Sequence, residues 1–88
     1  MPPLLELNRK HRATLEKIKH RPERSDIPWK DIESLFLALG AEISEGRGSR
    51  LRVFLNGTRA VFHRPHPQKE TDKGAVKSVR RFLESSEE

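Results

Sequence analysis

The sequence predicts an α+β fold in which a three-stranded antiparallel sheet carries two helices on one face (order α-β-β-β-α), preceded by an extra N-terminal helix. Asn56-Gly57 separates two runs of alternating polarity, which is the pattern of a β-hairpin. Apolar residues recur at helical spacing over 29–39 and again over 73–84. One antiparallel sheet with both helices on its apolar face is the simplest way to bury these patterns together.

The hairpin over 48–67 has a predictable register. Asn56-Gly57 favours a two-residue type I′ turn because both residues tolerate positive φ. The pairs are then Leu55–Thr58, Phe54–Arg59, Val53–Ala60, Arg52–Val61, Leu51–Phe62 and Arg50–His63. Because side chains alternate along a strand, one face is apolar and should be buried: Leu51, Val53, Leu55, Ala60 and Phe62. The other face is expected to be exposed and consists of Arg50, Arg52, Phe54, Arg59, Val61 and His63.

In the N-terminal part of the chain, the sequence predicts a loosely ordered terminus followed by a peripheral helix. Residues 1–8 begin with Met-Pro-Pro and are expected to be loose. Residues 9–21 have a helix-forming composition, but their apolar stripe is thin and consists mainly of Ala13, Leu15 and Ile18. A stripe this thin favours an appended helix over a core element. Residues 21–26 are expected to form a linker or turn.

A helix and the first strand follow. Pro28 suits the first turn of the helix, and Gly40 suits its C-terminal end. The helix has one apolar face, made of Ile32, Leu35, Phe36 and Leu39. We expect Trp29 to close the edge of the core, with stacking on a base as the alternative. Residues 41–45 alternate in polarity and predict a strand, and 46–48 predict a flexible turn.

The C-terminal part of the chain predicts a loop and a final helix. Pro65 and Pro67 end the third strand, because proline cannot continue a sheet ladder. Residues 68–73 are expected to be a polar connection, and 85–88 a tail. The final helix, about 73–84, has an inward stripe of Ala75, Val76, Val79, Phe82 and Leu83. The complete order of elements is the outline of the double-stranded-RNA-binding domain (dsRBD), although an outline alone does not assign a function.

Composition limits the classes of function. The 88 residues suffice for one small domain, and the absence of cysteine excludes disulfides and thiolate metal sites. We find neither a membrane-spanning apolar run nor a secretory signal, and therefore expect a cytoplasmic protein. Residues 47–81 hold ten of the 18 Lys and Arg residues but only two of the 13 Asp and Glu residues. A polyanion is the natural partner of this segment, and an acidic protein is the alternative.

The exposed hairpin face contains the parts needed for RNA cleavage without a metal ion. Such cleavage needs a base for the 2′-hydroxyl proton and cations for the phosphate, and histidine and arginine meet these needs. His63 is the candidate base, and Phe54 is a candidate for base stacking. An ordinary cross-strand polar pair is the alternative for His63, and a loop histidine that fixes the turn is the alternative for His66. His63-x-x-His66 lacks a third ligand, so we expect no metal and no other cofactor.

Three segments, in this order, resemble the HicA toxins of bacterial type II toxin–antitoxin systems. They are Leu39-Gly40, Gly48-Ser49-Arg50, and His66-Pro67-Gln68-Lys69-Glu70 with Lys73-Gly74 opening the last helix. The resemblance covers about residues 28–84. It implies a dsRBD-like fold, mRNA cleavage that arrests growth, and neutralisation by a HicB-like antitoxin. It also implies an N-terminal extension, 1–24, before a HicA-like domain, 25–88.

The sequence departs from the family pattern at one position. The resemblance implies a catalytic histidine directly after Gly-Ser, where this sequence has Arg50, and arginine stays protonated at neutral pH. Either the base has moved to His63, with His66 as the second candidate, or the protein binds RNA or a protein partner without cutting. The candidate RNA- and phosphate-binding residues are Arg50, Arg52, Phe54, Arg59, Arg64, Lys69 and Lys73. The sheet face and the N-terminal helix are the expected docking surfaces for an antitoxin.

Overall fold

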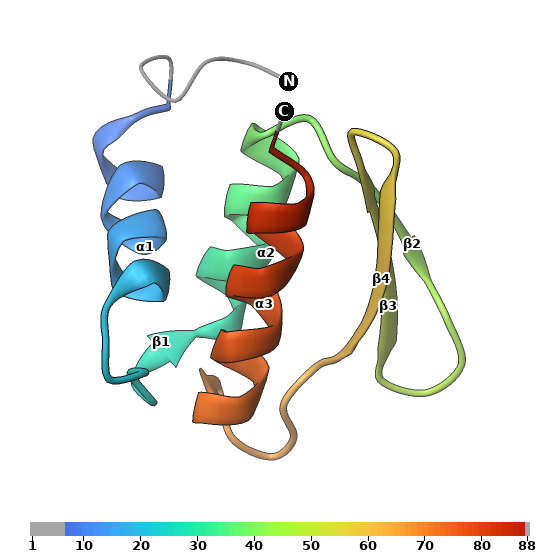
Figure 1. Cartoon of the computed structure of the whole chain (residues 1–88). Coiled ribbons are helices and arrows are strands. Elements are labelled where there is room, and N and C mark those ends of the chain that lie inside the picture. Colours follow the sequence, from blue (N-terminus) through green and yellow to red (C-terminus); the bar gives the residue numbers. More distant parts are fainter. Residues whose placement is uncertain (1–6, 88) are drawn as a thin grey trace.

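The structure is a computed structural model, and it describes residues 7–87. The helices are α1 (Arg9–Lys19), α2 (Trp29–Ala38) and α3 (Lys73–Ser85). The strands are β1 (Ile27–Pro28), β2 (Glu42–Glu45), β3 (Arg50–Leu55), β4 (Thr58–His63) and β5 (Glu70–Thr71). The strands β2-β3-β4 form one antiparallel sheet, and α2 and α3 lie side by side against it (Figure 1). The predicted α+β fold with helices at both ends is confirmed.

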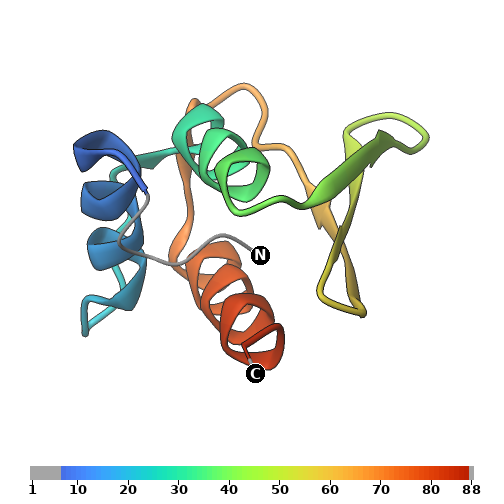
Figure 2. The ribbon, with the colours of Figure 1, turned by 90° about the horizontal axis from the view of Figure 1, so that it is seen from above.

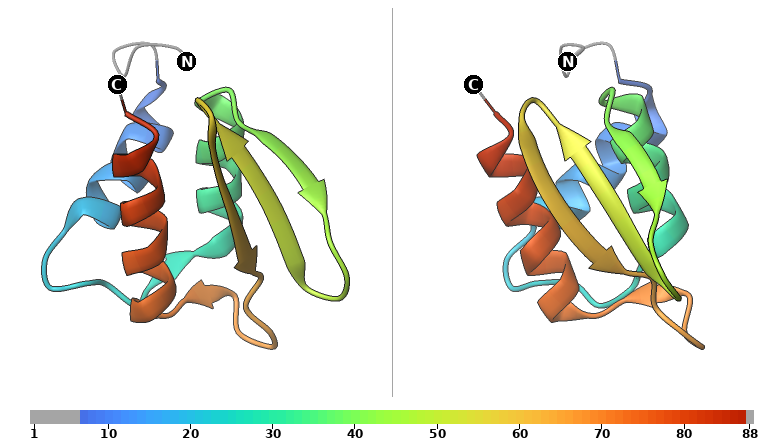
Figure 3. Two further views of the ribbon diagram at one scale, coloured as in Figure 1. Left: turned by 45° about the vertical axis from the view of Figure 1, so that its right-hand side comes forward. Right: turned by 90° about the vertical axis from the view of Figure 1, so that its right-hand side faces the viewer.

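The β3–β4 hairpin has the predicted register at all six pairs, from Leu55–Thr58 to Arg50–His63. Asn56 and Gly57 adopt φ values of 49° and 80°, as a type I′ turn requires. Burial alternates along β3, and the buried positions are those of the predicted apolar face. The other face of the sheet looks toward the viewer in the right-hand panel of Figure 3, with the helices behind it.

Four of the five aromatic side chains form the centre of the core. Trp29, Phe36, Phe62 and Phe82 come from α2, β4 and α3, and their ring centroids lie 5.6–6.5 Å apart in five contacting pairs. Trp29 is only 5% exposed, which agrees with a place in the core. These rings join the sheet to both helices. Their contacts add to the stability that the burial of apolar surface supplies.

The expectation that α1 is an appended helix is wrong, because α1 is part of the core. Ile18 is fully buried and Leu15 is 8% exposed, and Figure 2 shows α1 packed on the side of α2 and α3 that faces away from the sheet. The predicted stripe was also wrong at Ala13, which faces solvent, whereas the neighbouring Thr14 is buried and donates to the carbonyl of Lys10. The three buried side chains of α1 suffice to hold it in the core, because α2 and α3 together form the surface on which they pack.

The ends of the chain also differ from expectation. Of the segment 1–8, expected to be loose, residues 1–6 lie outside the described part of the chain. Leu7 is buried and Asn8 caps α1 by accepting a hydrogen bond from the amide of His11 at 2.8 Å. In the expected tail, Ser86 is 2% exposed and its hydroxyl donates to Leu83. Short polar side chains of this kind form hydrogen bonds with the unpaired backbone groups at helix ends. Their polarity alone does not distinguish a capped helix end from a loose terminus.

A second, two-stranded sheet was not predicted. In β1 and β5, Ile27 pairs with Thr71 and Pro28 pairs with Glu70, and Lys69 accepts a hydrogen bond from the amide of Trp29 at 2.9 Å. The supposed polar connection over 68–73 therefore contains a strand. Two residues are too few for an alternating pattern, so the sequence carries no signal for them. The pairing ties the start of α2 to the start of α3.

Candidate functional site

The exposed face of the sheet combines cations with apolar side chains. Its six predicted residues are all exposed: Arg50, Arg52, Phe54, Arg59, Val61 and His63. Phe54 and Val61 are two of the three large hydrophobic residues that are exposed in the part of the chain that the structure describes. A shallow hollow of about 670 Å³ lies on this face, and β2 contributes Glu42 and Ser44 to its lining. The face can thus offer both charge and stacking surface to a partner.

Phe54 and Arg59 form one end of this face, next to the hairpin turn. They are cross-strand partners, and the Arg59 guanidinium carbon lies 5.3 Å from the centroid of the Phe54 ring. This distance is within the range of a cation–π contact. An aromatic ring beside a planar cation is the combination on which nucleic-acid bases stack.

Arg50 and His63 form the opposite end of the face, where β3 begins and β4 ends. The amide of Arg64 donates to the carbonyl of Ser49 at 2.9 Å, which makes Arg50–His63 a non-hydrogen-bonded pair. In such pairs the Cα atoms come to about 4.5 Å, so these two side chains are close neighbours. A Cβ atom on Gly46 would lie 2.9 Å from the Cβ of Arg50, so the turn before β3 needs glycine there.

Arg64, directly after His63, is held by two carboxylates. It donates to Glu33 of α2 at 2.8 and 3.1 Å, and to Glu45 of β2 at 2.5 and 2.7 Å. These hydrogen bonds raise the pKa of Arg64, and the hydrogen bond from Arg64 lowers the pKa of Glu45. We call these three residues the Arg64 clamp. It fixes the exit of β4 against both α2 and β2.

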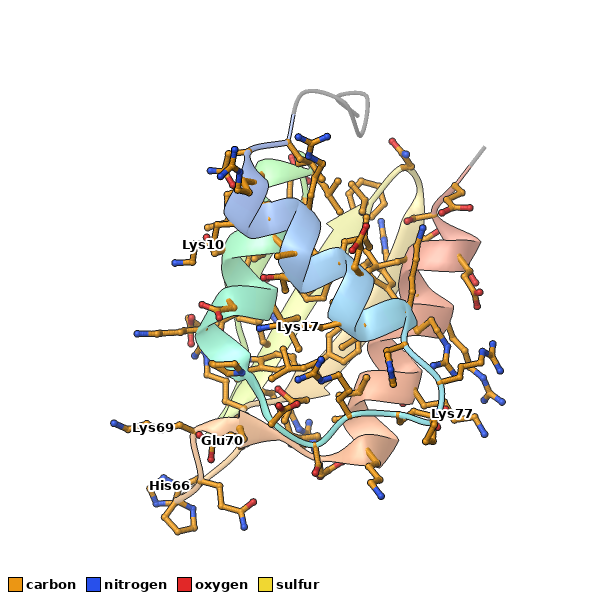
Figure 4. The ribbon with its side chains drawn as sticks, turned by 90° about the vertical axis from the view of Figure 1, so that its left-hand side faces the viewer. Lys10, Lys17, His66, Lys69, Glu70 and Lys77 are labelled. Carbon is orange, nitrogen blue, oxygen red and sulfur yellow. The ribbon has the colours of Figure 1, made fainter. Side chains whose placement is uncertain are left out.

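The loop between β4 and β5 extends from this same end of the sheet. Figure 4 shows His66 at its outer tip and Lys69 beside Glu70, where β5 begins. The Arg64 clamp anchors the start of the loop, and the carbonyl of Lys69 anchors its end. Lys73 opens α3 one residue after its N-cap, Asp72. The predicted site residues therefore fall into two groups, one around Arg50 and His63 and the other around Phe54 and Arg59.

Sequence reasoning missed the acidic partners in this region. Glu33 and Glu45 are 31 and 19 residues from Arg64 in the chain, and no local pattern predicts that they meet. Arg80 did carry a signal, because it lies within the apolar stripe of α3. Its side chain is 6% exposed and donates to Glu23 at 2.7 Å. A buried arginine requires such a partner.

Between residues 7 and 87, no three or more His, Cys, Asp or Glu side chains are grouped as a metal site would require. Within the same range, each helix is too short or too polar to cross a bilayer.

The fold and the site define a small α+β protein with a basic, partly aromatic sheet face. The family model described as the HicA toxin of bacterial toxin–antitoxin systems matches residues 29–85. This match covers more than half of the chain, so the chain belongs to the HicA toxin family and its membership implies an antitoxin partner. No curated protein and no solved structure matched the chain. The matched segment begins with α2 and ends with α3, and α1 lies outside it.

Proposed function

We propose that this toxin binds mRNA and cleaves it as an endoribonuclease without a metal ion, and that a HicB-like antitoxin neutralises it in the bacterial cytoplasm. The pairing of His63 with Arg50 on the exposed sheet face is the observation that supports this most directly. Resemblance to HicA puts the family's catalytic histidine at Arg50, so His63 brings an imidazole next to that position. Residues 1–24 are the extension and 25–88 the toxin domain in this proposal.

In the proposed reaction His63 takes the proton of a ribose 2′-hydroxyl. The 2′-oxygen then bonds to the adjacent phosphorus while the bond to the 5′-oxygen breaks, and a proton donor, for which His66 is the candidate, completes the 5′-hydroxyl. The products are a 2′,3′-cyclic phosphate and a 5′-hydroxyl end. Arg50 and Arg52 stabilise the negative charge that grows on the phosphate oxygens in the transition state.

The remaining candidates position the RNA strand. Phe54 and Arg59 stack a base beyond the cleavage point, and their 5.3 Å contact arranges the ring and the cation in advance. Lys69 and Lys73 contact phosphates on the other side of the cleavage point. Arg64 contacts a phosphate only if that phosphate displaces Glu33 or Glu45, because both carboxylates are hydrogen-bonded to its guanidinium.

The second candidate function is binding without cleavage. Arg50 itself favours it, because an arginine in place of a catalytic histidine removes the base and keeps the phosphate contact. In this case the exposed face binds RNA, or docks an acidic partner through the same arginines and Phe54.

The experiment that tests the proposal combines induction in growing cells with incubation of purified protein and mRNA in the presence of EDTA. We expect growth arrest and RNA fragments with cyclic phosphate ends, both abolished by His63→Ala. His20→Ala changes an exposed histidine in the segment between α1 and β1 and is the matched control. Arrest that persists in His63→Ala assigns the chemistry elsewhere, with His66→Ala tested next. Intact RNA and normal growth with folded protein favour the binding module.

A further inference from the structure

The helical side of the molecule has a basic surface of its own. Lys73, Lys77 and Arg81 occupy exposed positions at i, i+4 and i+8 of α3. Residues at this spacing lie on one face of a helix. At 1.5 Å per residue, successive cations are about 6 Å apart and the row is about 12 Å long.

The N-terminal segment, which lies outside the family match, adds a cation beside this row. The partly buried Arg80–Glu23 pair fastens the segment after α1 to α3. The hydrogen bond from Arg80 is the main cause of the lowered pKa of Glu23, and Lys77 contributes to it. The hydrogen bond from Arg24 is the main cause of the lowered pKa of Asp26, and Lys17 contributes to it, so the two lysines lie near the same segment. Figure 4 shows Lys17 on α1 and Lys77 on α3, on the same side of the molecule.

This surface lacks the apolar anchors that protein interfaces use. The exposed large hydrophobic residues among residues 7–87 are Leu37, Phe54 and Val61, and none belongs to α1, α3 or the segment between α1 and β1. Protein interfaces centre on buried apolar and aromatic anchors and are poor in lysine. A phosphate backbone, in contrast, requires only cations at suitable spacing. The surface therefore fits a nucleic-acid backbone better than a protein.

We propose that Lys17, Lys73, Lys77 and Arg81, here called the helical basic surface, bind the sugar–phosphate backbone of the RNA that the sheet face cleaves. The inference rests on the proposed function, since it assumes that RNA is the ligand. Lys73 connects the two surfaces, because α3 begins at the end of the molecule where β4 leaves the sheet (Figure 1). The sheet and α1 lie on opposite sides of α2 and α3 (Figure 2), so an RNA strand that leaves His63 passes round this end of the molecule before it continues along α3. Lys17 of the N-terminal extension adds a further phosphate contact.

The test measures binding of a fluorescein-labelled polyuridine of about 20 nucleotides by anisotropy over a range of salt concentrations. The full-length His63→Ala protein is the parent, so that cleavage does not interfere. Lys77→Gln/Arg81→Gln removes two charges from the helical basic surface. Lys10→Gln/Lys30→Gln removes two exposed charges elsewhere and is the matched control. Arg52→Gln/Arg59→Gln tests the sheet face.

We expect Lys77→Gln/Arg81→Gln to weaken binding about tenfold and to reduce the salt slope by about 1.4, with little change in the control. Binding equal to that of the control overturns the inference, and the proposed function stands if Arg52→Gln/Arg59→Gln still loses affinity. A parent that binds no RNA overturns both. Unchanged RNA binding with weaker binding of polyglutamate assigns the surface to an acidic protein and overturns the inference as well. Equal thermal unfolding of all variants establishes that folding is intact.

Discussion

Arg64 and Glu33 are joined by two parallel hydrogen bonds, from Nε to Oε2 at 2.8 Å and from Nη2 to Oε1 at 3.1 Å. Glu45 binds the other side of the same guanidinium, so Arg64 is a fixed structural cation between two strands and a helix. Its sequence position, directly after His63 and in the most basic part of the chain, indicates a phosphate contact. Its carboxylate partners indicate a residue that positions the end of β4.

Glu45→Gln distinguishes these two roles of Arg64. If Arg64 contacts phosphate, the variant removes a negative charge and one of the two acceptor oxygens at position 45, so the guanidinium is held less tightly and RNA affinity rises severalfold. We expect this outcome, because Glu45 is exposed and its loss leaves the two bonds to Glu33 in place. The measurement is RNA anisotropy with Glu42→Gln, an exposed residue of the same strand, as control for the charge. A fall in affinity would assign Arg64 to positioning alone.

Acid is expected to destabilise the fold through carboxylates that are paired with arginine. The hydrogen bond from Arg24 lowers the pKa of Asp26 from 3.8 to about 2, and Arg80 and Arg64 lower those of Glu23 and Glu45. A carboxyl with a lowered pKa contributes stability above its unfolded pKa, and this stability is lost as the pH falls through the folded value. The midpoint temperature of thermal unfolding should therefore fall as the pH is lowered from about 4 to about 2.

Asp26→Asn should reduce this acid dependence, because asparagine has no carboxyl group that takes up a proton between about pH 4 and pH 2. Arg24→Gln should have a similar effect, since it removes the cation that lowers the pKa of Asp26. The measurement is the midpoint of thermal unfolding at several pH values. Identical pH profiles for the parent and for both variants would contradict the assignment.

Local and long-range features of this fold differ in how well the sequence predicts them. The hairpin register follows from two adjacent residues, Asn56 and Gly57, and all six pairs agree. The Arg64 clamp and the β1–β5 pairing join segments that are far apart in the chain, and no periodicity marks them. Of the candidate site, the exposed face and the Arg50–His63 pair were predictable because they depend on the hairpin alone. The anchoring of the His66 loop was not.

Ile18→Ala tests the finding that α1 is part of the core. Ile18 is fully buried, so its truncation should cost about 2–5 kcal/mol of unfolding free energy. Lys19→Ala, at an exposed position next to it, should change the stability by less than about 0.5 kcal/mol. Urea denaturation of both variants provides the comparison. A small effect of Ile18→Ala would restore the view of α1 as an appended helix.

Phe54→Leu separates binding from stability on the sheet face. Phe54 is the one phenylalanine outside the aromatic core, and it is 36% exposed beside Arg59. Replacing it should therefore leave the unfolding free energy nearly unchanged, while the loss of base stacking weakens RNA binding by about 1–3 kcal/mol. Val61→Ala, on the same face, is the matched control and should retain RNA affinity. If Phe54→Leu instead binds RNA normally but loses affinity for the antitoxin, the aromatic end of the sheet is a docking site, and the helical side and the His63 end hold the RNA.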